Sequence, residues 1–206
     1  MSYGSQNIAV YSGSFNPLHI GHLAIIRHMI EVAGFDMVYL IVSPKNPLKD
    51  GISSDSGRER YMAAVEAVER RFLRSGLSAS GRNDSKAVEA RVKVDDIELN
   101  MPEPHYTIRT LDALKEREPD NRFTLVMGAD NLADIGRWRD YTRILKEFGV
   151  AVFPREGHDL TEIKQDLLKE DPAYMIQILD AEMVDISSTQ IRKAIAEGED
   201  ISKYLM

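Results

Sequence analysis

Short runs of consecutive apolar residues alternate along the chain with segments whose apolar residues recur every three or four positions. Continuous apolar runs are typical of strands buried on both faces, and the longer spacing is typical of amphipathic helices. Strands are expected over residues 8–12, 37–43, 91–99, 123–128 and 149–153. Helices are expected over residues 22–33, 56–73, 107–118, 159–171 and 187–199.

This alternation predicts an α/β fold, with a doubly wound parallel sheet covered by helices on both faces. Such three-layer folds bind ligands at the carboxyl ends of the strands, where the strand order reverses. A single domain over residues 1–206 is expected. Residues 74–87, rich in Ser and Gly, do not fit the alternation and predict a flexible surface loop.

Composition narrows the classes of protein that this fold could serve. The chain has 206 residues, no cysteine and a net charge of −7, which excludes disulfides and cysteine nucleophiles and argues against a nucleic-acid-binding surface. No apolar run approaches the ~20 residues of a membrane helix. The first residues lack the features of a signal peptide, so a cytoplasmic protein that binds no membrane is expected. Whether the protein forms a homo-oligomer is left open by the sequence.

The stretch "GSFNPLHIGH" (13–22) joins the first strand to the first helix. Its glycines allow unusual backbone geometry or close approach, and its Asn-Pro pair predicts a turn. Three interpretations of His19 and His22 compete: capping or core groups, a metal pair, and phosphate binding at a helix N-terminus. The metal pair lacks an evident third ligand, and neither glycine-rich nucleotide fingerprint is present.

A second motif, "VDISSTQIRKAI" (184–195), opens the last helix. Ser187 or Ser188 is a suitable N-cap, and Ser188 and Arg192 are four residues apart on one helix face. A hydroxyl, free backbone N–H groups and a guanidinium there favour an anion. The alternative is an ordinary capped helix with a surface arginine.

Together the two motifs resemble the signatures of the nucleotidyltransferase superfamily, whose HIGH-like motif is shared with class I aminoacyl-tRNA synthetases. The whole chain is similar to the bacterial nicotinate-nucleotide adenylyltransferase family. The further stretches that carry this resemblance are "SPKNPLKDGISSDSGRERYMAAV" (43–65), "HYTIRTLDAL" (105–114) and "MGADNLADIGRWRDY" (127–141). His105 stands where that family usually has serine.

The resemblance implies transfer of AMP from ATP to nicotinate mononucleotide, in NAD biosynthesis, with Mg²⁺ held mainly by the ATP phosphates and no protein metal ligands. The implied catalytic residues are His19, His22, Lys49 and Arg192. The implied ATP-binding residues are Gly13, Ser14, Phe15, His19, Gly21, His22, Gly128, Asp130, Ile186, Ser187, Ser188, Thr189 and Arg192. The implied nicotinate-mononucleotide-binding residues are Ser14, Phe15, Asn16, Lys49, Tyr106, Thr107 and Trp138.

Alternatives remain at several of these positions. Lys45 and Lys49 are surface lysines in the simplest interpretation, and Asp130 is a helix N-cap. Trp138, the single tryptophan, either stacks on the nicotinate ring or packs its own helix. Nicotinamide mononucleotide or phosphopantetheine is the alternative acceptor.

Overall fold

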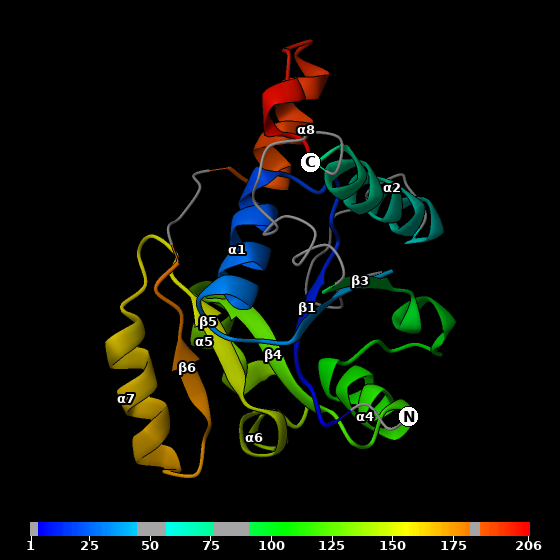
Figure 1. The fold of residues 1–206 in the computed structure, drawn as a ribbon. Helices are drawn as coiled ribbons and strands as arrows, with labels where there is room; N and C mark the ends of the chain where they lie inside the picture. Colours follow the sequence, from blue (N-terminus) through cyan, green and yellow to red (C-terminus); the bar gives the residue numbers. More distant parts are fainter. Residues whose placement is uncertain (1–3, 45–56, 76–90, 182–185) are drawn as a thin grey trace.

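The computed structural model describes residues 4–44, 57–75, 91–181 and 186–206, and its centre is a parallel sheet (Figure 1). The strand order is β3-β2-β1-β4-β5-β6, and every adjacent pair is parallel. The strands are β1 (Asn7–Gly13), β2 (Met37–Val42), β3 (Val92–Asp95), β4 (Arg122–Gly128), β5 (Val150–Phe153) and β6 (Ile176–Ile178). The order reverses between β1 and β4, so the carboxyl ends of these two strands frame the expected ligand position.

Helices cover both faces of the sheet, because side chains alternate between its faces along each strand. The helices are α1 (Ile20–Glu31), α2 (Gly57–Ser75), α4 (Thr107–Arg117), α5 (Ala129–Ala133), α6 (Tyr141–Arg143), α7 (Leu160–Glu170) and α8 (Ser188–Ala196). Ile8 and Val10 of β1 pack into one core cluster, which includes residues of α4, α5 and α7. Ala9 and Tyr11 pack into the other, which includes residues of α1 and α2.

Short helical turns complete the described chain. They are η1 (Ile97–Asn100), η2 (Ile135–Arg137), η3 (Ile144–Phe148) and η4 (Ser202–Tyr204). The helix α8 lies at the upper end of the molecule in Figure 1, beside the start of α1 and opposite α6. The motif that opens α8 therefore lies next to the motif that leads into α1. Among the helices in the described ranges, none has the length and apolar character that a membrane crossing requires.

The predicted doubly wound fold is confirmed, with its main helices and strands within a few residues of their expected bounds. The strand expected over 91–99 is wrong beyond Asp95. There the Asp95 carboxylate accepts a hydrogen bond from the Ile97 N–H at 3.0 Å, and a 3₁₀ turn follows. The three-residue edge strand β6 was not predicted, because so short a run carries no clear period.

The boundary of the predicted loop at 74–87 also changes. Residues 74 and 75 belong to α2, and the remainder of that loop lies outside the described residues. Lys45 and Lys49 lie outside them as well. The single domain over residues 1–206 stays a prediction.

Candidate active site

The turn after β1 is built around a buried phenylalanine. Phe15 is only 3% exposed and has a φ of 45°, in the left-handed region that bulky residues rarely adopt. Such a conformation costs roughly 1–3 kcal/mol and persists where packing determines it. The Phe15 ring packs edge-on against Tyr11 at 5.4 Å and against His22 at 5.2 Å. The turn therefore fixes the position of the second histidine.

The glycines of this motif are required by space rather than by backbone freedom. A Cβ on Gly13 would lie 3.2 Å from the Phe15 ring, and no positive φ occurs at Gly13. This corrects the expectation that Gly13 serves an unusual backbone conformation. A Cβ on Gly21 would lie 3.1 Å from the His19 ring and 3.2 Å from the Ile186 side chain. Gly21 thus lets the first and second motifs approach each other, and the predicted close approach at this glycine is confirmed.

His19 and His22 form one pair at the N-terminus of α1. Their ring centroids are 3.7 Å apart, and His19 is the N-cap of the helix. The His19 backbone N–H donates to Nδ1 of His22 at 3.2 Å. Because Nδ1 accepts this bond, a neutral His22 carries its proton on Nε2. That N–H and the free backbone amides of the first helical turn are donors suited to a phosphate.

Both imidazoles are neutral in the free protein at pH 7. Burial, and then the positive charge of Arg155, lower the pKa of His19 to about 4. Burial lowers the pKa of His22 well below its usual value, with further contributions from His19 and Arg155. Positive charges nearby oppose a protonated imidazole and favour a bound anion. The pair therefore offers hydrogen bonds and an electropositive setting without its own charge.

Acid should destabilise the free protein through this pair. Between the unfolded value of 6.5 and the folded value of about 4, the unfolded chain binds a proton at His19 that the folded chain does not. The free energy of unfolding should therefore fall as pH decreases from 6.5 to 4, and urea titrations at pH 7 and pH 5 measure the fall. The double variant His19→Asn/His22→Asn should lose less stability than wild type over this interval. An equal loss in both proteins would contradict this expectation, and the exposed His158→Asn variant serves as the matched control.

The second motif docks on the first through hydrogen bonds. Ser187 caps α8 by accepting the Gln190 N–H at 3.2 Å, which selects it over Ser188 as the predicted cap. The Ser188 hydroxyl donates to the carbonyl of Pro17 at 3.2 Å, and Arg192 donates to the carbonyl of Asn16 at 2.8 Å. Two segments more than 160 residues apart in the chain thus meet at one turn.

Two hydroxyls and a guanidinium gather at the start of α8. Arg192 also donates to the Thr189 hydroxyl at 3.1 Å, so Ser188, Thr189 and Arg192 lie together there. The nine-residue helix offers further unpaired amides at this end. This end of α8 meets the turn that leads to the histidine pair, which extends the set of anion-binding groups.

The carboxyl end of β4 contributes Gly128 and Asp130. A Cβ on Gly128 would lie 2.4 Å from the Asp130 carboxylate and 3.3 Å from Nε of Arg155, so a side chain there would displace the Asp130 carboxylate. Gly128 is the N-cap of α5 and Asp130 lies inside its first turn. The alternative interpretation of Asp130 as an N-cap is therefore wrong.

Arg155 was missed by the sequence analysis. Its guanidinium lies over the Phe153 ring at 5.2 Å, and its charge acts on His19, His22 and Tyr11. Burial is the larger influence on Tyr11, raising its pKa above the usual value. A signal was available, since Arg155 comes two residues after a buried strand, at the ligand-binding edge of a parallel sheet.

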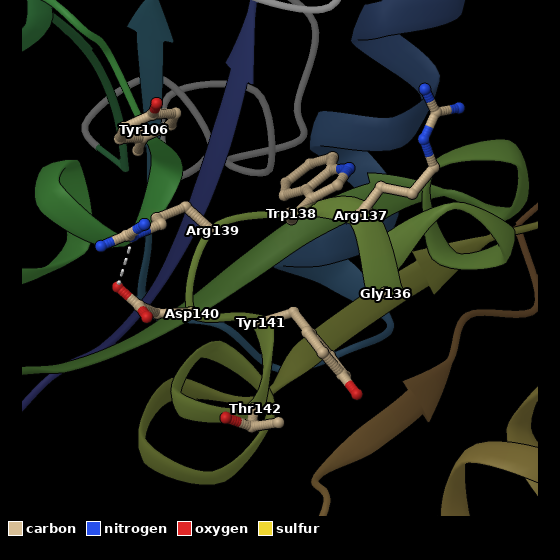
Figure 2. Close-up of a pocket in the computed structure, with 8 residues that line it drawn as sticks. All are labelled: Tyr106, Gly136, Arg137, Trp138, Arg139, Asp140, Tyr141 and Thr142. Carbon is tan, nitrogen blue, oxygen red and sulfur yellow. Dashed lines mark ion pairs between the residues drawn. The ribbon is translucent and has the colours of Figure 1, made fainter.

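A separate pocket of about 530 Å³ brings together Tyr106 and Trp138, two of the predicted acceptor-binding residues (Figure 2). Figure 2 shows Arg139 on the Tyr106 side of the pocket, paired with Asp140 at 3.5 Å, whereas Arg137 extends away from Tyr106. The remaining lining residues are Gly136, Tyr141 and Thr142. Two aromatic rings with a neighbouring guanidinium suit a planar anionic ring.

Other predicted acceptor-binding residues lie elsewhere. Thr107 does not line this pocket and is the first residue of α4. Phe15 and Asn16 line a second pocket of about 330 Å³ beside α2. Nε1 of Trp138 and Nδ1 of His105 are buried without a hydrogen-bond partner. Over the described ranges, no three His, Asp or Glu side chains gather closely enough to hold a metal ion.

Comparison with known proteins agrees with this geometry. The family model "Cytidylyltransferase-like" matches residues 10–194. A Flavobacterium johnsoniae protein named "Probable nicotinate-nucleotide adenylyltransferase" is 36% identical over 97% of this chain and 92% of its own length. A Bacteroides fragilis protein of the same name is 35% identical over 95% of this chain and 85% of its own length.

The fold has solved counterparts. A Plasmodium falciparum nicotinic acid mononucleotide adenylyltransferase, complexed with NaAD, superposes with a TM-score of 0.73 at 21% identity, covering 97% of this chain and 90% of that one. At this identity the likeness shows the fold. The family model and the relatives, which span nearly the whole chain, show more: the chain belongs to the cytidylyltransferase-like family and, within it, to the nicotinate-nucleotide adenylyltransferases.

Proposed function

We propose that the protein transfers AMP from ATP to nicotinate mononucleotide, forming nicotinate adenine dinucleotide and pyrophosphate. The observation that carries this proposal is the meeting of the two motifs. The rings of His19 and His22 lie 3.7 Å apart, and Ser188 and Arg192 bind the carbonyls of the turn just before them. The names of the curated relatives support the choice of reaction.

The phosphates of ATP lie between α1 and α8 in this proposal. His19, His22 and the amides of the first turn of α1 hold the α- and β-phosphates, while Ser188, Thr189 and Arg192 hold the β- and γ-phosphates. Gly13, Ser14 and Phe15 line the point where the two nucleotides meet. Ile186, Ser187, Gly21, Gly128 and Asp130 complete the ATP site, with Asp130 toward the ribose. Arg155 adds positive charge near the histidines.

Catalysis then consists of positioning and charge stabilisation. A phosphate oxygen of nicotinate mononucleotide attacks the α-phosphorus of ATP in line, and the bond from that phosphorus to the bridging β-phosphate oxygen breaks. The electron pair leaves with pyrophosphate. The nucleophile is already an anion, so no general base is needed. Lys49, which lies outside the described residues, is proposed to neutralise charge that develops in this step.

Mg²⁺ fits this site as an ion held by the ATP phosphates and water. Magnesium keeps several waters and binds through substrate phosphates rather than in an all-protein cage. We assign no protein ligand to the ion, because Asp130 is assigned to the ribose. The ion would screen the repulsion between the triphosphate and the incoming phosphate.

The pocket between Tyr106 and Trp138 is proposed to hold the nicotinate ring. Thr107 lies outside its lining, and its role toward the carboxylate stays a prediction. Arg139 favours a carboxylate over a carboxamide in this pocket, because its guanidinium can form an ion pair with a carboxylate but not with a neutral amide. Nicotinamide mononucleotide is therefore the weaker of the two candidate acceptors.

Purified protein with ATP and Mg²⁺ should release pyrophosphate with nicotinate mononucleotide, at a higher kcat/KM than with nicotinamide mononucleotide. Arg139→Gln should lower the ratio of the two kcat/KM values roughly tenfold, which corresponds to about 1.4 kcal/mol. Arg137→Gln, on the neighbouring arginine that extends away from Tyr106, should leave the ratio unchanged. No pyrophosphate with either mononucleotide or with phosphopantetheine would refute the proposed function. An unchanged ratio in Arg139→Gln would refute only the role of Arg139.

A further inference from the structure

A buried arginine of α2 holds the ends of two strands. Arg60 is 6% exposed, and its guanidinium donates to three backbone carbonyls. One nitrogen binds Ser14 O at 3.0 Å and Ser43 O at 2.8 Å, and the other binds Pro44 O at 2.7 Å. Ser14 follows β1, while Ser43 and Pro44 follow β2. The planar fork of one side chain thus joins two loops at the ligand-binding edge of the sheet.

On the β1 side, Arg60 orients the peptide unit that precedes Phe15. The bound carbonyl of Ser14 belongs to the Ser14–Phe15 peptide, and the rotation of this unit sets the φ of Phe15. That φ is 45°, a conformation that a phenylalanine does not adopt without support. The Phe15 ring in turn packs edge-on against His22 at 5.2 Å. A path of direct contacts therefore runs from Arg60 to the histidine pair.

On the β2 side, every polar group of Ser43 is bound. Its N–H donates to Gly13 O at 2.9 Å, its carbonyl accepts from Arg60, and its hydroxyl donates to the buried Glu98 carboxylate. Glu98 also accepts from the Thr110 hydroxyl at 2.8 Å. The end of β2 is thereby fixed to the end of β1 and to α4. The bonds made by Ser43 and Glu98 hold this end of β2 in one position.

We propose that Arg60 is a positioning residue for the nucleotidyl transfer, and this inference rests on the proposed function. Its Nη1 and Nη2 atoms are occupied by backbone carbonyls. It fixes the orientation of the Ser14–Phe15 peptide and the position of the residues that follow β2. Through Phe15 it also fixes the position of the His22 ring. Small displacements of groups that must meet a transition state cost rate rather than affinity. Loss of Arg60 should therefore act mainly on kcat.

The test compares Arg60→Ala with Arg70→Ala. Arg60→Ala should lower kcat about 10²-fold, with KM for ATP changed by less than about threefold. Millimolar guanidinium should restore kcat in a saturable way, whereas urea, a neutral molecule of similar shape, should not. Arg70 lies on the same helix, is exposed and pairs with Glu66, so Arg70→Ala should keep wild-type kcat and show no guanidinium response. A role in folding alone would lower the folded fraction and leave kcat per folded molecule unchanged.

A second readout is independent of activity. Backbone amide exchange over residues 12–18 should become about tenfold faster in Arg60→Ala and stay at the wild-type rate in Arg70→Ala. Unchanged exchange, or wild-type kcat in folded Arg60→Ala, overturns the inference. If Arg60→Ala does not fold, Arg60→Lys replaces it, because an ammonium cannot reproduce the planar fork. Wild-type kcat or unchanged exchange in Arg60→Lys overturns it equally. An inactive wild type refutes the proposed function, and the exchange result still decides the role of Arg60.

Discussion

Replacing His22 with alanine should lower kcat by about 10²–10³-fold, the cost of losing one preorganised donor to developing charge in a transition state. The His22 Nδ1 is occupied by the His19 backbone N–H at 3.2 Å, which leaves Nε2–H as the donor for a phosphate. The imidazole is neutral at pH 7 because burial and nearby positive charge lower its pKa. Its contribution is therefore a directed hydrogen bond, and steady-state pyrophosphate release measures the loss.

Two isosteric variants separate this donor from the structural bond. His22→Asn places an acceptor near the position of Nδ1 but has no donor near Nε2, so it should be as slow as His22→Ala. His22→Gln places an amide near the position of Nε2 and should recover part of the rate. Thermal unfolding of each variant checks that the fold is retained. A near wild-type rate in His22→Asn would show that the Nε2 donor does not act in the reaction.

The parts of this molecule that could be predicted from sequence are those set by local pattern. Runs such as Ile8–Ser12 and Met37–Ser43 are apolar on both faces, which happens in strands covered by helices on two sides, so both strands were placed within two residues. A cap at Ser187 or Ser188 was predicted for the same reason, because capping depends on neighbouring residues alone, and the structure selects Ser187.

The parts that could not be predicted depend on distant residues. The sequence does not indicate that Arg60 reaches Ser14, 46 positions away, or that Glu98 turns inward to Ser43. The reason for Gly13 was misjudged although Phe15 is only two residues away, because the unusual conformation of Phe15 places its ring where a side chain on Gly13 would lie. The positions of these side chains in the folded chain decide each feature.

Replacing Arg192 with glutamine should lower kcat/KM for ATP by roughly 10²-fold. Arg192 both docks α8 on the Asn16 carbonyl at 2.8 Å and offers its remaining donors to the triphosphate. The expected loss is below the 10³–10⁵-fold given by an arginine that stabilises the transferring phosphoryl group itself. Arg192 is exposed in the free protein, and the Ser188 hydroxyl and the amides of α8 share its task. Arg192→Lys should lose nearly as much, because an ammonium cannot bind an anion in the planar two-point manner.

The matched control for Arg192 is its neighbour on the same helix. Lys193 has the same charge, has a side chain that is 76% exposed and pairs with Glu197, the C-cap of α8, at 3.8 Å. Lys193→Ala should therefore keep wild-type kcat/KM. A loss equal to that of Arg192→Gln would indicate a general effect of positive charge rather than specific binding of the triphosphate by Arg192. If Arg192→Gln kept wild-type kcat/KM for ATP, α8 would only stabilise the turn at Asn16 and Pro17 that precedes the histidine pair. Its hydroxyls and guanidinium would then have no part in binding the triphosphate.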